Sequence, residues 1–244
     1  MKISGKRILI TGGTAGIGLA LARALHERGA HLIICGRDAA RLDRALSTMA
    51  GAHGVVCDTG NAADLTRLVD EAVGLLGGLD VLINNAGIQR QWSLGEADST
   101  PEDAAREVAV NLVGPIQLAY LALPHLREGV EPAIVNVTSV LALKPKLSAP
   151  VYCATKAGLR SFTQGLRLQL QPFGVRVVEL MPPLVETAMT HGRTEGTIDA
   201  HAMAAATVQG LERGGDEILV GKARAAARLD RFLPGVLAKM LARS

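Results

Sequence analysis

The feature that most constrains the fold is the regular alternation of short, mostly apolar runs with longer amphipathic segments. The runs have the length of strands and lie at residues 7–11, 31–35, 55–58, 81–84, 134–138, 175–180 and 217–220. Helix-like segments separate them, at residues 16–28, 38–49, 62–76, 101–127, 151–171 and 199–213. Because the runs lack polar alternation, both faces of each strand should be covered. Strand–helix–strand order with right-handed crossovers therefore predicts an α/β protein with a doubly wound parallel sheet of about seven strands.

Length and composition limit the remaining possibilities. The 244 residues suffice for one large domain over 1–244, and no linker divides them. A net charge of +3 without a basic, aromatic-rich stripe does not predict a nucleic-acid partner. Three scattered cysteines predict neither a disulfide framework nor a metal site. Without a signal-peptide pattern or an apolar run of ~18–20 residues, we expect a cytoplasmic protein with no membrane span.

A glycine-rich turn joins the first strand to the first helix. Residues 11–18 read TGGTAGIG, and their glycines include Gly12, Gly16 and Gly18. Glycines permit a tight turn and a close approach to a pyrophosphate, which the free N–H groups of the helix bind. The order T-G-x-x-x-G-x-G differs from G-x-G-x-x-G, and a turn without a ligand would also account for it.

The end of the second strand bears on which dinucleotide is bound. An NAD site typically places an acid there for the ribose 2′-hydroxyl, whereas this strand ends in Cys35, Gly36 and Arg37. Arg37 can offer its guanidinium to a 2′-phosphate, and Asp38 suits the cap of the following helix. The sequence favours NADP(H), with NAD(H) possible and a solvated surface arginine as the alternative.

Tyr152 and Lys156 lie four residues apart on a predicted helix and therefore share one face. An ammonium near a phenol favours the phenolate and lowers the pKa of the tyrosine from about 10, which would make Tyr152 a general acid or base. Ser139 follows a buried strand and so lies at the edge of the sheet where ligands bind. Asn84, Asn85, Ala86 and Gly87 end another strand. Asn111 is an amide within an apolar helical stretch that needs a polar partner.

Taken together, TGGTAGIG, NNAG, Asn111, Ser139 and YCATK resemble the short-chain dehydrogenase/reductase family over nearly the whole chain. The resemblance implies a Rossmann-type sheet with helices on both faces and a hydride transfer between NADP(H) and a small carbonyl or alcohol substrate. It also implies the catalytic set Asn111, Ser139, Tyr152 and Lys156, in which Asn111 positions a water molecule and Lys156 also holds the nicotinamide ribose. Homodimers or homotetramers formed through the fourth and fifth helices are expected from the family.

The resemblance also implies a cofactor-binding set. It comprises Gly12, Thr14, Gly16, Ile17, Gly18, Arg37, Asp58, Asn85, Ala86, Gly87, Tyr152, Lys156, Pro182, Val185 and Thr187. In this set Asp58 would hydrogen-bond the adenine, and Val185 and Thr187 would touch the nicotinamide amide. The chain departs from the family at Pro183, where P-G-x-V-x-T is usual and a proline fixes φ. The Pro-Pro form is similar to a branch named for association with D-alanine transfer.

The C-terminal residues 222–244 form a basic amphipathic pattern that Pro234 divides. Its apolar positions at helical spacing are Leu229, Phe232, Leu233, Val236, Leu237, Met240 and Leu241. We expect this tail to pack on its own domain or on a second subunit, with reversible attachment to an anionic membrane as the alternative. For the whole chain, the alternative to an enzyme is a dinucleotide-binding regulatory or scaffold protein without turnover.

Overall fold

The computed structural model describes residues 1–91, 100–183 and 198–242. Within these residues, seven parallel strands form one sheet in the order β3-β2-β1-β4-β5-β6-β7. This confirms the predicted sheet. The strands are β1 (Arg7–Thr11), β2 (His31–Gly36), β3 (His53–Val56), β4 (Val81–Asn84), β5 (Ala133–Val137), β6 (Arg176–Met181) and β7 (Glu217–Leu219).

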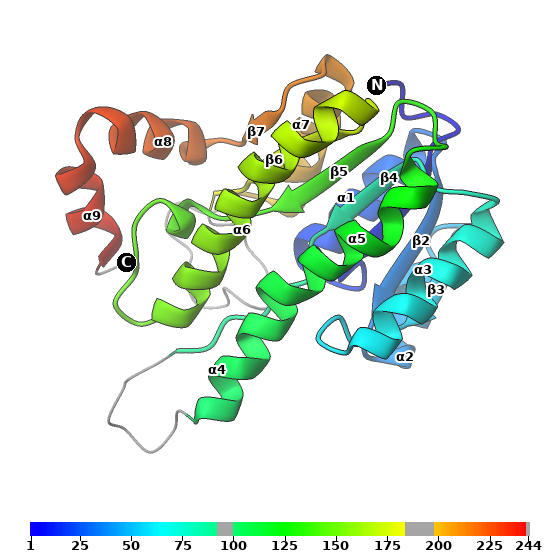
Figure 1. The fold of residues 1–244 in the computed structure, drawn as a ribbon, viewed down its shortest axis with the longest axis horizontal. Coiled ribbons are helices and arrows are strands. Elements are labelled where there is room, and N and C mark those ends of the chain that lie inside the picture. The colour runs from blue at the N-terminus through cyan, green and yellow to red at the C-terminus, as the bar shows by residue number, and fades with distance from the viewer. Residues whose placement is uncertain (92–99, 184–197, 243–244) are drawn as a thin grey trace.

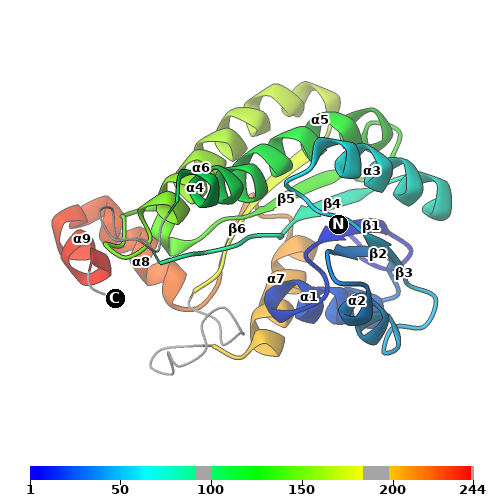
Figure 2. The same ribbon diagram turned by 90° about the horizontal axis from the view of Figure 1, so that it is seen from below.

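Helices cover both faces of the sheet, as predicted (Figures 1 and 2). One face carries α3 (Ala62–Leu76), α4 (Pro101–Val108), α5 (Gly114–Leu126) and α6 (Pro150–Leu170), and the other carries α1 (Gly16–Glu27), α2 (Ala39–Leu46) and α7 (Ala200–Arg213). Short turns η2 (Val140–Ala142) and η3 (Gln171–Phe173) flank α6. Two further helices, α8 (Lys222–Phe232) and α9 (Pro234–Ala242), follow β7 and lie at one end of the molecule.

Alternate side chains of each strand enter the two layers of the core. In β1, Ile8 and Ile10 pack into the cluster that contains residues of α1 and α7, while Leu9 packs against residues of α3 and α5. All three side chains are fully buried. This two-sided burial explains why the strands read as continuous apolar runs.

The segment expected as one helix over 101–127 is interrupted. Thr100 caps α4 by accepting a hydrogen bond from the Asp103 N–H, but residues Ala109–Val113 form a π-helical turn, η1, before α5 begins. By length and composition alone, Pro101–Leu126 is long and apolar enough to cross a membrane, a test that the core helix of a soluble protein also passes. In this fold Leu118, Ala122 and Leu126 of that stretch are buried against the sheet.

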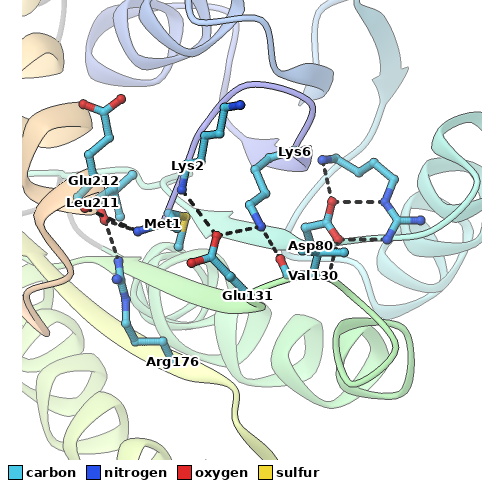
Figure 3. Close-up of polar contacts among 10 residues, drawn as sticks. Met1, Lys2, Lys6, Asp80, Val130, Glu131, Arg176, Leu211 and Glu212 are labelled. Atoms are coloured by element: carbon cyan, nitrogen blue, oxygen red, sulfur yellow. Dashed lines mark hydrogen bonds and ion pairs between the residues drawn. The ribbon is translucent and has the colours of Figure 1, made fainter.

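The amino ends of the central strands are joined by a polar network (Figure 3). Asp80, just before β4, accepts hydrogen bonds from the backbone and guanidinium of Arg7 and from the Val130 N–H. Beside it, Lys6 contacts the Val130 carbonyl and the Glu131 carboxylate. This network fastens β1, β4 and β5 at the edge opposite their carboxyl ends.

Candidate active site and dinucleotide cavity

A cavity of about 350 Å³ lies at the carboxyl ends of the strands. Its lining runs from the glycine-rich turn and the end of β2, past the residues that follow β4, to α6 and Pro182. It contains the predicted residues Gly12, Thr14, Gly16, Ile17, Gly18, Arg37, Asn85, Ala86, Gly87, Tyr152, Lys156 and Pro182. The structure therefore brings together, around one hollow, residues from across the chain.

The glycine-rich turn is shaped by close contacts that side chains would prevent. Gly12 has a φ of +67°, a conformation that glycine adopts readily. A Cβ on Gly18 would lie 2.2 Å from the Gly12 carbonyl oxygen and 2.4 Å from Nδ2 of Asn85. Ala15, at the N-cap of α1, has no polar side-chain atom with which to cap the helix. The first N–H groups of α1 therefore face the cavity region without a side-chain cap from that residue.

Asn85 and Thr11 hold the turn against the end of β4. The Asn85 amide donates to the carbonyl oxygens of Thr11 and Gly12 at 2.9 and 3.2 Å. In return, the Thr11 hydroxyl accepts from the backbone N–H groups of Asn85 and Ala86, each at 3.0 Å. The role of Asn85 in this structure is to brace two backbone segments that line the cavity.

Asn111 lies in the π-helical turn η1 and is completely buried. Its Oδ1 accepts from the Ile88 N–H at 2.8 Å, and its Nδ2 donates to the Ile88 carbonyl at 2.8 Å and to the Thr155 hydroxyl at 3.2 Å. These bonds supply the polar partner that the sequence required. They also fix the segment after β4 against α6, because Thr155 belongs to α6.

Tyr152, Ser139 and Lys156 meet at one end of the cavity. Ser139 is the residue before η2, and a hydrogen bond links it to the Tyr152 phenol. Lys156 is buried, donates to the Val137 carbonyl at 2.8 Å, and its Nζ lies 5.7 Å from the centre of the Tyr152 ring. A Cβ on Gly87 would lie 3.3 Å from Oδ1 of Asn111 and 3.6 Å from Nζ of Lys156, so Gly87 leaves room beside both.

The pKa of Tyr152 moves in the direction opposite to the one expected from Lys156. Burial raises the pKa of Tyr152 to about 12, and the hydrogen bond with Ser139 opposes this rise without cancelling it. Burial also lowers the pKa of Lys156 to about 8. The expectation that Lys156 lowers the tyrosine pKa considered charge alone, whereas desolvation of the phenolate has the larger effect in this structure.

Two guanidinium groups line the other end of the cavity. Arg37 follows β2, and Arg41 comes one turn later on α2. Asp38 caps α2 by accepting from the Arg41 N–H at 3.0 Å, as expected. Sequence reasoning missed Arg41, which lies in the first turn of α2 just after its cap Asp38. Thr59, Ile88, Val110 and Thr138 were also missed as lining residues, because ordinary apolar and hydroxyl side chains carry no sequence signal of their own.

Asp58 follows β3, and its carboxylate is bound by other residues of the chain. Its carboxylate accepts from the Arg106 guanidinium at 2.5 Å and from the Gly60 N–H at 2.9 Å. Burial alone would raise the pKa of Asp58, but the bonds from Arg106 and Gly60 outweigh it and lower the pKa. The adjacent residues Cys57 and Thr59 line the cavity. Val185 and Thr187 lie outside the described residues.

Comparisons with known proteins agree with this geometry. The family model described as short chain dehydrogenase matches residues 6–197. An uncharacterized oxidoreductase named DltE from Bacillus subtilis is 39% identical over 224 residues, which cover 89% of each chain. This relative agrees with the similarity to the branch named for D-alanine transfer.

Solved structures of similar fold contain dinucleotides. A short chain dehydrogenase from Burkholderia cenocepacia in complex with NADP superposes with a TM-score of 0.87 at 30% identity and full coverage of both chains. A short chain dehydrogenase/reductase from Burkholderia phymatum in complex with NAD has the same TM-score at 25% identity, covering 97% of this chain and 96% of that one. The chain belongs to the short-chain dehydrogenase/reductase family of oxidoreductases.

Proposed function

We propose that this protein transfers a hydride between NADP(H) and a small carbonyl or alcohol substrate, with Tyr152 as the general acid or base. The observation that carries the proposal is the lining of the cavity. Tyr152 and Lys156 of α6 line it, with Ser139 hydrogen-bonded to Tyr152, and the guanidiniums of Arg37 and Arg41 line it beside the end of β2. The neighbours bound to NADP and to NAD support a nicotinamide dinucleotide as the cofactor.

The residues of the cavity fit such a cofactor. Because Gly12 and Gly18 have no side chains, the backbone of the turn is not covered at these positions. A Cβ at Gly18 would collide with the Gly12 carbonyl. Bare backbone beside a helix N-terminus suits a pyrophosphate. When bound, the dinucleotide would supply or accept the hydride at the substrate carbon.

The remaining chemistry belongs to side chains of this chain. Ser139 is placed to donate a hydrogen bond to the substrate oxygen while Tyr152 gives that oxygen a proton or removes one. Because burial raises the pKa of Tyr152 to about 12, the phenol of the free protein is protonated at neutral pH. It is therefore ready to act as the proton donor in carbonyl reduction.

Lys156 and Asn111 support the proton transfer. With its pKa lowered by burial to about 8, Lys156 stays mainly protonated at neutral pH and keeps a positive charge near the Tyr152 ring. That charge, with the positive charge of an oxidised nicotinamide, would stabilise a phenolate once the proton has left. Asn111 holds the Ile88 backbone in place, and we assign it the positioning of the proton relay.

The preference for NADP(H) rests on Arg37 and Arg41. Two guanidiniums, one just before α2 and one in its first turn, can bind a 2′-phosphate by charge-assisted hydrogen bonds. Asp38, which follows Arg37, is the cap of α2, and its carboxylate lies 3.5 Å from Nε of Arg41. The assembly into a homodimer or homotetramer and the cytoplasmic location stay predictions.

The test compares Tyr152→Phe with Tyr120→Phe, which changes the chain's other tyrosine, a side chain 74% exposed on α5. Oxidation of NADPH and NADH is followed against a panel of ketones and aldehydes, and dinucleotide affinity is titrated for each protein. Tyr152→Phe should lower kcat by at least ~10²-fold while dinucleotide affinity stays within about twofold. Tyr120→Phe should behave as the wild type. A Tyr152→Phe protein with most of its turnover intact would refute the assignment.

A further inference from the structure

The two C-terminal helices are fixed in place beside the segment that separates Ser139 from Tyr152. Asp230 of α8 forms an ion pair of 2.5 Å with Lys144, and the Leu147 N–H donates to the Ala242 carbonyl at 3.1 Å. Ala223 and Leu237 are buried and anchor α8 and α9, respectively. Figure 2 shows the pair at one end of the molecule.

Most of the apolar face of this pair is not packed on its own domain. Of the seven apolar positions recognised in the tail sequence, Leu237 alone is fully buried, whereas Phe232 is 73% exposed and Met240 61%. Leu233 and Val236 are also exposed, and so is Leu147, whose N–H bonds to the end of α9. The prediction that the tail packs on its own domain therefore explains the buried residues Ala223 and Leu237. It does not explain the exposed apolar side chains, which no described residue covers.

Positive charge surrounds the same surface. Residues 222–242 contain five cations, Lys222, Arg224, Arg228, Arg231 and Lys239, and all of them are exposed. The segment contains one acid, Asp230, whose carboxylate is engaged by Lys144. The surface formed by α8, α9 and Leu147, here called the tail surface, is thus apolar and strongly basic at once.

This charge distribution selects the kind of partner. A contact between two copies related by a two-fold axis brings the same patch of each together, so five cations would face five cations. An anionic lipid surface instead attracts the cations and accepts the apolar side chains between its headgroups. We propose that the tail surface docks the protein on membranes rich in anionic lipids, with Phe232, Leu233, Val236 and Met240 inserted at the headgroup level.

The test uses the full-length protein and vesicles of defined composition. The protein is sedimented with vesicles of phosphatidylcholine alone and with vesicles that also contain phosphatidylglycerol, at low and at high salt. It should sediment with the phosphatidylglycerol vesicles at low salt and be released at high salt. No sedimentation with the anionic vesicles at low salt would overturn the proposal.

Matched variants assign the binding to the tail surface. Arg228→Gln with Arg231→Gln should weaken vesicle binding by about 25-fold, at about fivefold per cation, whereas Arg213→Gln on α7 should leave it unchanged. Phe232→Ser with Met240→Ser should also release the protein, and Leu168→Ser, an equally exposed position on α6, should not. Unfolding curves and dinucleotide titration show that each variant is folded.

Two outcomes would contradict the assignment in different ways. Binding to anionic vesicles that the tail variants do not weaken would mean that another surface attracts the lipid. Dissociation of a dimer in the tail variants, in the absence of vesicle binding by the wild type, would mean that a second copy covers the tail surface. Neither outcome bears on the proposed hydride transfer, because Tyr152 and the cavity are unchanged in these proteins.

Discussion

Asp80 offers a prediction whose magnitude can be worked out from the structure. Its side chain is 4% exposed and accepts four hydrogen bonds, three from Arg7 and one from the Val130 N–H, at 2.8 to 3.1 Å. Burial by itself would raise the pKa of Asp80, but these bonds outweigh burial and lower the pKa from 3.8 to about 2. At about 1.36 kcal/mol per pKa unit, that difference corresponds to about 2.4 kcal/mol of stability.

The sign of the pH dependence follows from the lowered pKa. The stabilisation is fully present above the unfolded-state pKa of 3.8 and is lost as the pH falls from there toward about 2. In this range the unfolded state binds a proton on Asp80 while the folded state still holds the carboxylate charged, so acid favours unfolding. About half of it should be gone at about pH 3. Asp80→Asn should therefore lower the free energy of unfolding by about 2 to 3 kcal/mol near neutral pH, and by much less near about pH 2.

Urea unfolding followed by far-UV circular dichroism measures this difference at each pH. In a thermal scan, the same loss should lower Tm by about 5 to 10 °C for a domain of this size. Glu131→Gln is the matched control, since Glu131 contacts Lys6 at the same edge but its side chain is 57% exposed; its unfolding curve should match that of the wild type. A difference between Asp80→Asn and the wild type that stays constant from neutral to acid pH would refute the reasoning.

Three further predictions concern the cavity. Arg37→Asp should shift the binding preference from NADPH toward NADH. Arg41→Gln should weaken the binding of NADPH by about 10-fold and change the binding of NADH little; titration measures both affinities. Gly18→Ala should abolish dinucleotide binding while the protein stays folded, because its Cβ would lie 2.2 Å from the Gly12 carbonyl oxygen. In the dinucleotide-free protein, the NMR signal of the Lys156 ε-carbon, assigned with Lys156→Arg, should titrate near pH 8 rather than 10.5, because burial lowers this pKa.

The variants Arg37→Asp and Gly18→Ala each have a control in the same structure. Arg44→Asp changes an exposed cation of α2 that does not line the cavity, so it should leave the ratio of NADPH to NADH affinity unchanged. Gly165→Ala adds a methyl group in α6 where no neighbour lies within 4 Å and should leave dinucleotide binding intact. If Arg44→Asp and Arg37→Asp change the affinity ratio alike, general electrostatics and not a phosphate site explains it.

The sequence predicted the sheet and the main members of the cavity because both depend on local pattern. Apolar runs such as Ile8–Ile10 report burial on both faces directly, and glycines report backbone that cannot tolerate a side chain. The π-helical turn around Asn111 was not predicted, since no residue type marks it. Within that turn, Asn111 bonds to Ile88 and Thr155, residues distant in the sequence that the folded chain brings together.

The pKa values and ion-pair partners of the site residues could not be predicted from the sequence. The spacing of Tyr152 and Lys156 correctly places both on one helix, but their pKa values depend on how much protein covers them. Asp58 was predicted as an adenine contact, but the ion pair of its carboxylate with Arg106 of α4 was not predicted. Such partners are 48 residues apart in the chain, so neither periodicity nor motif could connect them.

The two edges of the sheet divide stability from chemistry. At the amino edge, Asp80 and Arg7 satisfy each other with hydrogen bonds of 2.8 and 3.1 Å, which join the starts of β1 and β4. At the carboxyl edge, the strand order reverses between β1 and β4, and the chains that leave these strands diverge and open the cavity. There, the amides of Asn85 and Asn111 bind backbone groups, which holds the cavity walls in place. The side chains of Tyr152, Arg37 and Arg41 line the same cavity. Substitutions that weaken the amino edge should therefore lower Tm without changing dinucleotide affinity, and substitutions of the bracing amides should change both.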